Sequence, residues 1–185
     1  MLNFHENVYL SEALKQSRYA EISANSANAI LLAPGSKDTG AFFASMHHYM
    51  SHIANISKIF WPTSNRPRAK RRGNYLRNSL TLSNTHPLSK MALRNHLEHF
   101  DDRLDEWAEN NKRSWIADEI VGAPSMLGSF DSSEIFRLFD PNTSSFIFRG
   151  EVYNIQDIED GRSDITRRII DRLKHLRVHQ QDHTS

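Results

Sequence analysis

The chain has 185 residues, enough for one well-packed domain and short for two, so we expect a single domain over residues 1–185. Hydrophobic residues make up 38% and aromatic residues 10% of the sequence, a balance that excludes a disordered chain. Cysteine is absent, which excludes disulfides and thiolate metal sites, and a net charge of +1 leaves attraction to polyanions to local clusters of charge. No apolar run of membrane-spanning length occurs, so we expect a cytoplasmic protein with no membrane partner.

The first part of the chain is predicted to be helical. Residues 7–32 place apolar and small side chains at helical spacing and stop at a Pro-Gly pair. A second helix opens near residues 36–38 and continues to Phe60, before a Trp-Pro pair. Residues 63–88 are polar and basic, and we expect them to form a mobile loop with one short helix at residues 75–80.

A long helix is predicted to begin near Pro87, a favourable early position for proline, and to run to about Lys112. The helical core would then span about residues 7–113. The β-prone runs IFRLF and FIF follow, with an Asp-Pro-Asn-Thr turn between them and the further run EVYNI behind. They predict a small β-hairpin element at about residues 133–155.

The C-terminal helix is predicted at about residues 163–178, where isoleucine and leucine recur at helical spacing. We expect residues 157–161 to form an acidic turn before it and residues 179–185 to form a frayed tail. The fold class is therefore mainly α: a bundle of four to five helices with a small β-hairpin appendage before the C-terminal helix.

The stretch from Met91 to Trp107 combines a polar motif with an apolar helix face. Apolar residues recur there at spacings of three and four and share one side of a helix: Leu93, Leu97, Phe100, Leu104 and Trp107. Arg94 and Asn95, followed by His99, lie along the same helix. This arrangement resembles the signature of the HEPN superfamily, an arginine and a polar residue followed after three to five positions by a histidine; HEPN proteins are helical bundles, of which many are metal-independent ribonucleases.

The resemblance implies a role for each residue of the motif. Arg94 would clamp a phosphate, His99 would transfer protons, and Asn95 would support them by hydrogen bonding. Guanidinium offers a charged fork of donors that matches phosphate, and imidazole titrates near neutral pH, so the chemistry needs no metal or other cofactor. The implied activity is endonucleolytic cleavage of single-stranded RNA in a toxin–antitoxin, phage-defence or stress system, with an antitoxin protein as a possible partner.

The spacing of the motif predicts an oligomer. On an undistorted helix Arg94 and His99 lie about 140° apart around the axis, so one helix presents them poorly to a single phosphate. Members of the resembled family solve this by dimerising, so that two motifs line one cleft. We therefore expect a two-fold homodimer with a composite site.

A structural interpretation of the same residues remains open. Arg94 and Glu98, one turn apart, would form a solvated ion pair worth only about 0.3 to 0.5 kcal/mol. The alternative function is that of a non-catalytic helical bundle that binds a partner protein or RNA without cutting it.

A basic run precedes the motif and is the predicted RNA-binding segment. Five of its seven positions are cations: Arg66, Arg68, Lys70, Arg71 and Arg72. Such a cluster can neutralise several phosphates of an RNA backbone. The alternative is a flexible, solvated loop whose charges balance acidic faces elsewhere in the protein.

Two further features of the sequence have simpler interpretations. His48 and His52 are one helical turn apart, a spacing that suits a metal ion, but no third ligand is evident and no metal site is expected. Either histidine could instead face the helix that carries the motif. Trp107 falls on the apolar stripe of that helix, so we expect it to fill core and not to stack on a base.

Overall fold

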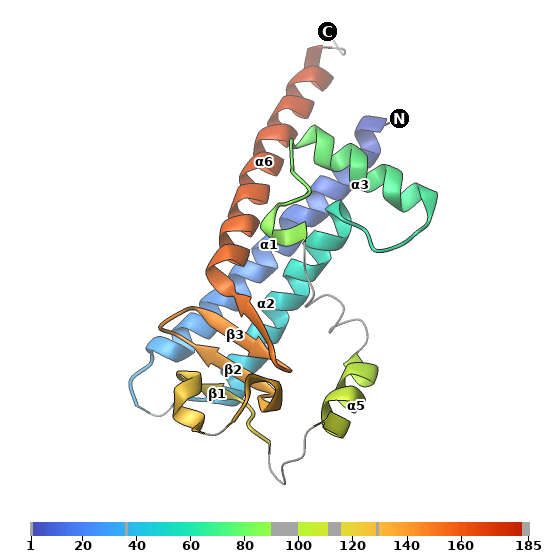
Figure 1. Cartoon of the computed structure of the whole chain (residues 1–185). Helices are drawn as coiled ribbons and strands as arrows, with labels where there is room; N and C mark the ends of the chain where they lie inside the picture. Colours follow the sequence, from blue (N-terminus) through green and yellow to red (C-terminus); the bar gives the residue numbers. More distant parts are fainter. Residues whose placement is uncertain (1, 36, 90–99, 111–115, 129, 183–185) are drawn as a thin grey trace.

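The computed structural model describes residues 2–35, 37–89, 100–110, 116–128 and 130–182. Within these ranges the protein is mainly helical, with a small four-stranded sheet near one end of the helices (Figure 1). The α-helices are α1 (Leu2–Leu32), α2 (Thr39–Phe60), α3 (Pro67–Ser79), α5 (Phe100–Asn110) and α6 (Ile155–Asp182). The strands are β1 (Ile120–Val121), β2 (Arg137–Asp140), β3 (Ser145–Phe148) and β4 (Glu151–Asn154), and short 3₁₀ helices occupy Pro87–Ser89, Pro124–Leu127 and Ser132–Glu134.

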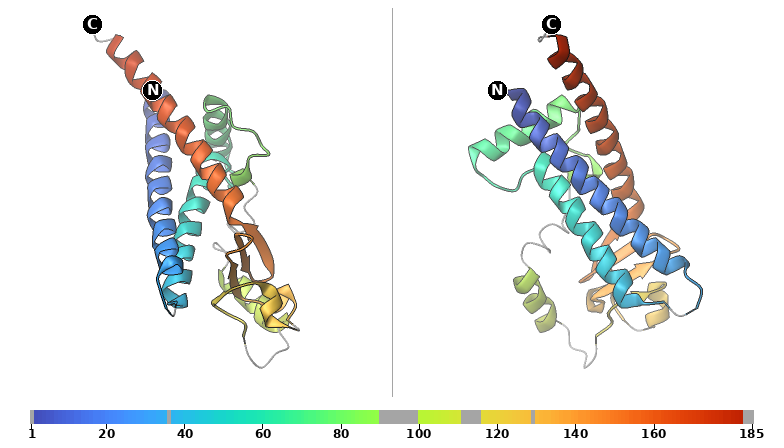
Figure 2. Two further views of the ribbon diagram at one scale, coloured as in Figure 1. Left: turned by 90° about the vertical axis from the view of Figure 1, so that its left-hand side faces the viewer. Right: turned by 180° about the vertical axis from the view of Figure 1, so that it is seen from behind.

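The core lies where α1, α2 and α6 pack side by side (Figures 1 and 2). The buried face of α1 consists largely of small residues, which allow close approach of the neighbouring helices: Leu10, Ala13, Ser17, Ala20 and Ala27. α2 supplies the bulky side chains that fill the space, among them Phe42, Phe43, Tyr49, Ile53 and Ile56. This division between small and large residues builds the bundle, because each layer of the core needs both to reach native packing density.

The sheet covers one end of the helix pair. Its strand order is β1-β2-β3-β4, with β1 parallel to β2 and the other neighbours antiparallel. Alternate side chains point to opposite faces, so the register pair Phe139 and Phe146 belongs to the main core, whereas Leu138 and Ile147 enter a second cluster. The ring of Phe139 lies 5.2 Å from that of Phe42 in α2, which anchors the sheet on the helices.

Several predicted elements are confirmed. The first helix is present and begins earlier than expected, at Leu2. The second helix begins where the sequence indicated, because the Asp38 carboxylate accepts a hydrogen bond of 2.9 Å from the backbone N–H of Ala41. The hairpin between residues 133 and 155 is present as β2, β3 and β4, but the two-residue β1 beside it was not predicted.

The long helix predicted from Pro87 to Lys112 is described only in part. A 3₁₀ helix spans Pro87–Ser89 and α5 lies within the predicted range. Trp107 is 9% exposed, and its indole nitrogen donates a 2.9 Å hydrogen bond to the carbonyl of Ser133. Its ring lies 4.9 Å from that of Phe136, so the expectation that Trp107 fills core is confirmed.

The C-terminal prediction is wrong at both ends. Residues 157–161, predicted to form a turn, are the first turns of α6, because the Asn154 side chain accepts a 3.0 Å hydrogen bond from the N–H of Asp157 and caps the helix. Gly161 marks a close approach: an added Cβ would lie 3.1 Å from Pro87 and 3.2 Å from Leu88. Helix α6 also continues to Asp182, through most of the predicted tail.

The prediction that residues 63–88 form a loop with a short helix at 75–80 is also wrong in its main part. Helix α3 contains the basic run, with Pro67 in its first turn. Alanine, lysine and arginine are good helix formers, but only Gly73 and Leu76 of α3 are fully buried, so the apolar stripe that reveals a helix in a sequence is nearly missing here.

The helices of the described ranges include no span that is long and apolar enough to cross a lipid bilayer.

Substitution of Gly73 tests the junction between α2 and α3. A Cβ there would lie 2.6 Å from Pro62 and 2.8 Å from the carbonyl oxygen of Phe60. We expect Gly73→Ala to lower the free energy of unfolding by roughly 1 to 3 kcal/mol through this overlap, although alanine ordinarily favours a helix by about 1 kcal/mol. The control is Gly40→Ala in α2, where the nearest atoms are 3.6 Å away. Urea unfolding of both variants measures the difference, and a Gly73→Ala variant as stable as Gly40→Ala would contradict the packing described.

Candidate functional site

The predicted catalytic motif lies outside the described residues. The chain is described up to Ser89 and again from Phe100, and Arg94, Asn95 and His99 fall between. Cleavage at this motif and the composite dimer site therefore stay predictions. The groups that the structure does place belong to two other locations, one beside α3 and one between α2 and α6.

All five predicted RNA-binding cations belong to α3 or its first boundary. Arg66 is the N-cap residue, and the other four lie in the first two turns. Arg66, Arg68, Lys70 and Arg71 are exposed to solvent, while Arg72 is half buried. The helix fixes the direction in which each side chain leaves the backbone, whereas a loop would not.

Three of the five cations share one side of α3. Arg68, Arg71 and Arg72 line an open hollow of about 550 Å³ together with Tyr75, and α1 contributes Tyr9 to the opposite wall. Lys70 lies roughly 160° around the helix from Arg68 and does not line this hollow, and neither does Arg66. We call this space between α3 and the N-terminal part of α1 the α1–α3 hollow.

The arginines of the hollow differ in how they are held. The Arg72 guanidinium donates a 3.1 Å hydrogen bond to the carbonyl of Lys58 and lies 5.0 Å from the centre of the Tyr9 ring. The side chains of Arg68 and Arg71 make no hydrogen bond or ion pair with any other residue in the described ranges. Arg72 is therefore part of the wall, whereas Arg68 and Arg71 present charge to an incoming anion.

A buried carboxylate joins three helices beneath the hollow. Glu6 of α1 is 1% exposed and accepts hydrogen bonds from the Arg172 guanidinium of α6, at 2.8 and 3.1 Å. The Tyr75 hydroxyl of α3 donates to the same carboxylate at 2.8 Å. One polar side chain from each of α1, α3 and α6 therefore meets the others at this point.

The three groups hold each other in defined protonation states. Burial raises the pKa of Glu6, but the hydrogen bonds from Arg172 and Tyr75 outweigh burial and leave that pKa below its ordinary value. Burial, and then the hydrogen bond to Glu6, raise the pKa of the Tyr75 phenol. The hydrogen bond to Glu6 raises the pKa of Arg172. The cluster is therefore an ionised carboxylate, a neutral phenol and a charged guanidinium at neutral pH.

Sequence reasoning missed Glu6 and Arg172. A usable signal was present in α1, where Glu6, Leu10 and Ala13 continue at spacings of four and three as one buried stripe. A carboxylate on such a stripe requires a partner, because a lone buried charge is strongly unfavourable. The sequence does not indicate that the partner is Arg172, since it lies 166 positions further along the chain.

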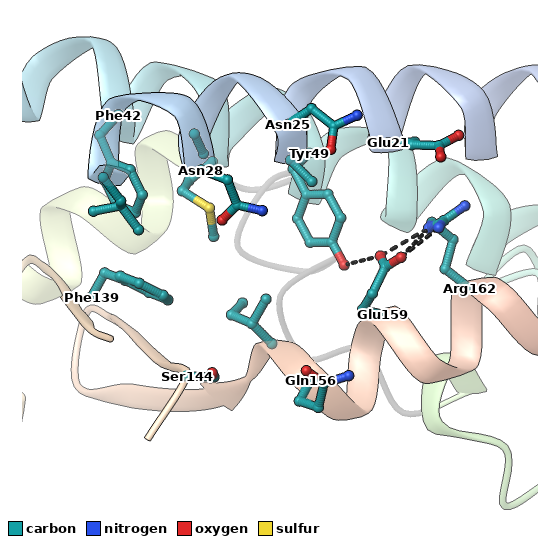
Figure 3. A pocket seen from close by; sticks show the side chains of 15 residues that line it. Glu21, Asn25, Asn28, Phe42, Tyr49, Phe139, Ser144, Gln156, Glu159 and Arg162 are labelled. Atoms are coloured by element: carbon teal, nitrogen blue, oxygen red, sulfur yellow. Dashed lines mark hydrogen bonds and ion pairs between the residues drawn. The ribbon is translucent and has the colours of Figure 1, made fainter. Parts of the chain in front are cut away.

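A second polar cluster lines a cavity of about 280 Å³ between α1, α2, β2 and the start of α6 (Figure 3). Tyr49 donates a 3.2 Å hydrogen bond to Glu159, and the Arg162 Nε donates to both oxygens of the same carboxylate at 3.0 and 2.8 Å. A 2.7 Å hydrogen bond also joins Arg162 to the Ser17 hydroxyl of α1. Glu159, which was predicted to lie in a turn, thus lines one wall of a cavity.

The cluster of Tyr49, Glu159 and Arg162 carries little net charge. Burial, followed by the charge of Glu159, raises the pKa of the Tyr49 phenol above its ordinary range. The hydrogen bond to Glu159 raises the pKa of Arg162. At neutral pH the phenol therefore keeps its proton, and the carboxylate and guanidinium neutralise each other.

One of the two histidines singled out in α2 contacts α1. His52 faces α1, where its Nδ1 lies 2.8 Å from the side-chain oxygen of Gln16 and its ring lies 5.3 Å from that of Tyr19. The motif itself lies outside the described residues, so the suggestion that His48 or His52 faces it stays a prediction. No group of three histidine, aspartate or glutamate side chains in the described part of the chain is arranged to hold a metal ion.

No protein-family model matches this chain, and no curated protein and no solved structure matches it either.

Neutralisation of Glu6 tests the carboxylate cluster. We expect Glu6→Gln to lower the free energy of unfolding by roughly 2 kcal/mol at neutral pH, because charge-assisted hydrogen bonds to Arg172 are lost inside the protein. The control is Glu12→Gln on the same helix, where the carboxylate is exposed, and there we expect little change.

The effect of Glu6→Gln should depend on pH in one direction. The folded state lowers the pKa of Glu6, so its contribution is complete above the ordinary glutamate pKa and disappears as the pH falls through the lower, folded value. The stability difference between wild type and Glu6→Gln, measured by urea unfolding across acidic pH, should therefore shrink with decreasing pH. A difference that grows toward acid would contradict this cluster.

Proposed function

We propose that this protein binds single-stranded RNA in the α1–α3 hollow and cleaves it without a metal ion through Arg94 and His99. The observation that carries the binding step is the pair of guanidinium groups, Arg68 and Arg71, exposed on one side of α3 without partners among the described residues. The cleavage step rests on the motif in the sequence.

The chemistry of the hollow favours a nucleic acid strand. Guanidinium groups bind phosphate oxygens through two parallel hydrogen bonds, and Arg68 and Arg71 lie one turn apart, so they can meet neighbouring phosphates. Tyr75 is 36% exposed beside them and offers a ring face to an unstacked base. A single strand exposes such bases, whereas a duplex keeps them stacked, and this favours single-stranded RNA.

The hydrogen-bonded walls of the hollow favour binding at a defined site over non-specific electrostatic attraction. Tyr75 is held by Glu6 and Arg72 by the carbonyl of Lys58, so two walls are in place before a ligand arrives. Ordering of flexible side chains weakens binding, and a preformed wall reduces that cost.

For cleavage we propose the roles that the resemblance implies. Arg94 stabilises the charge that grows on the phosphate oxygens, and Asn95 supports the site by hydrogen bonding. His99 of one subunit takes the proton from the attacking 2′-hydroxyl, or the protonated His99 donates a proton to the leaving 5′-oxygen. Two subunits would supply the cleft, and the product would carry a cyclic phosphate. The proposed setting is a toxin–antitoxin, phage-defence or stress system in which an antitoxin protein restrains the activity.

The alternative proposal is a helical bundle that binds RNA or a partner protein without cutting. The free arginine charges on α3 fit RNA binding whether or not cleavage follows, so a binding measurement and a cleavage measurement separate the two proposals.

Removal of the free arginines tests RNA binding. We expect the double variant Arg68→Ala/Arg71→Ala to bind a fluorescent single-stranded RNA about tenfold or more weakly and to reduce the slope of log K against log salt by roughly 1.4, since each phosphate contact on a single strand contributes about 0.7. The control is Lys70→Ala, on the far side of the same helix, which should change both quantities much less. Equal effects of the two variants would mean that the hollow is not the binding surface.

Removal of the motif residues tests cleavage. Purified wild-type protein incubated with single-stranded RNA in the presence of a chelator should produce fragments that end in a cyclic phosphate. Arg94→Ala and His99→Ala should each reduce the rate by about a hundredfold or more while RNA binding persists, because general acid–base groups contribute on that scale. Binding by the wild type without any cleavage would favour the alternative proposal, and unchanged cleavage by both variants would refute the proposed mechanism.

A further inference from the structure

The cavity of Figure 3 has the size and lining of a small-molecule site. Its volume is about 280 Å³, near the lower end of ligand pockets in proteins, which begin at roughly 300 Å³. Its inner wall is apolar and includes Met46 and the rings of Phe42 and Phe139, which lie 5.2 Å apart. The face of a flat ring system fits such a wall.

Carboxamide groups line the mouth of the same cavity. Asn25 and Asn28 lie one turn apart on α1, and Gln156 at the start of α6 lines the cavity with them (Figure 3). The side chains of Asn25 and Asn28 form no hydrogen bond with any other described residue. Gln156 donates from its side-chain nitrogen to Asp160 at 2.8 Å, which leaves its oxygen as an acceptor. The mouth therefore offers donors and acceptors in the paired arrangement that carboxamides use to bind base edges.

The charge of the lining disfavours anions. Glu159 is neutralised by Arg162 and also accepts a hydrogen bond from Tyr49, so it is not available to a cationic ligand. Glu21, exposed at the mouth, also lies within electrostatic reach of Arg162, so the lining holds two carboxylates against one guanidinium and carries a net negative charge. This net negative charge would repel a phosphate, whereas it would not repel an uncharged ligand.

From these features we infer that this cavity binds an uncharged nitrogen heterocycle, a free nucleoside, with its base ring against Phe139 and its base edge hydrogen-bonded to Asn25, Asn28 and Gln156. The site is distinct from the α1–α3 hollow, since no residue lines both. It does not depend on RNA binding or on cleavage, and it selects a ligand without phosphate where the α1–α3 hollow selects phosphates.

Calorimetric titration of the full chain with adenosine, guanosine, cytidine and uridine, each compared with its 5′-monophosphate, tests the inference. At least one nucleoside should bind, and its monophosphate should bind about tenfold or more weakly because of Glu21. Asn28→Leu should weaken the nucleoside by about tenfold or more, since it removes the carboxamide and fills part of the mouth.

The matched control is Ser26→Leu, an exposed position of α1 that does not line the cavity, and its nucleoside affinity should equal that of the wild type. Asn28 is itself exposed on a helix, so Asn28→Leu should fold, and circular dichroism checks this. Three results would overturn the inference: no binding of any of the four nucleosides, monophosphates that bind as well as nucleosides, or a folded Asn28→Leu variant with unchanged affinity.

Discussion

The ionic contact between Glu6 and Arg172 is the interaction on which the arrangement of the helices depends. It joins the first helix to the last, and the Tyr75 hydroxyl attaches α3 to the same carboxylate. α3 has only two fully buried residues of its own, so apolar packing alone holds it weakly. A buried carboxylate with good donors adds direction to this attachment, because hydrogen bonds fix orientation where apolar contact does not. The face of α3 that carries Arg68 and Arg71 is oriented by this contact.

A second polar network also joins α6 to α1, nearer the start of α6. Arg162 of α6 connects Glu159 to Ser17 of α1, and Tyr49 of α2 donates to the same glutamate. α6 is therefore tied to α1 at two separated places by arginines. The α1–α3 hollow and the cavity of Figure 3 border these networks, so the groups that join the helices also form walls of the candidate sites.

The sequence predicted those features that depend on local patterns. Apolar spacing located α1 and α2, and alternation with turn residues located the hairpin of β2 and β3. It failed for α3, whose stripe is too short to detect, and at Gly161, which a sequence suggests as a turn but which lies in a helix close to Leu88. In both cases tertiary contacts decide the structure, and single-sequence patterns do not contain them.

The candidate sites were predictable to different degrees. The basic run that contains Arg68 and Arg71 was evident in the sequence. That Lys70 points to the other side follows from the helical conformation of α3, which was not predicted. The contribution of α1 to the hollow could not be predicted, because Tyr9 and Arg72 are far apart in sequence and meet only in the fold. The cavity beside Glu159 depends on three helices and a strand and left no trace in local spacing.

Hydrogen exchange of the protein with and without a 2′-O-methylated single-stranded RNA, which cannot be cleaved through its 2′ position, tests the central claim most directly. RNA in the α1–α3 hollow should slow exchange of backbone amides in the first turns of α1 and in α3, and leave β2, β3 and the start of α6 unchanged. Slower exchange confined to the sheet, or no change in α3 at RNA concentrations that saturate the protein, would contradict the proposal that this hollow is the RNA-binding surface.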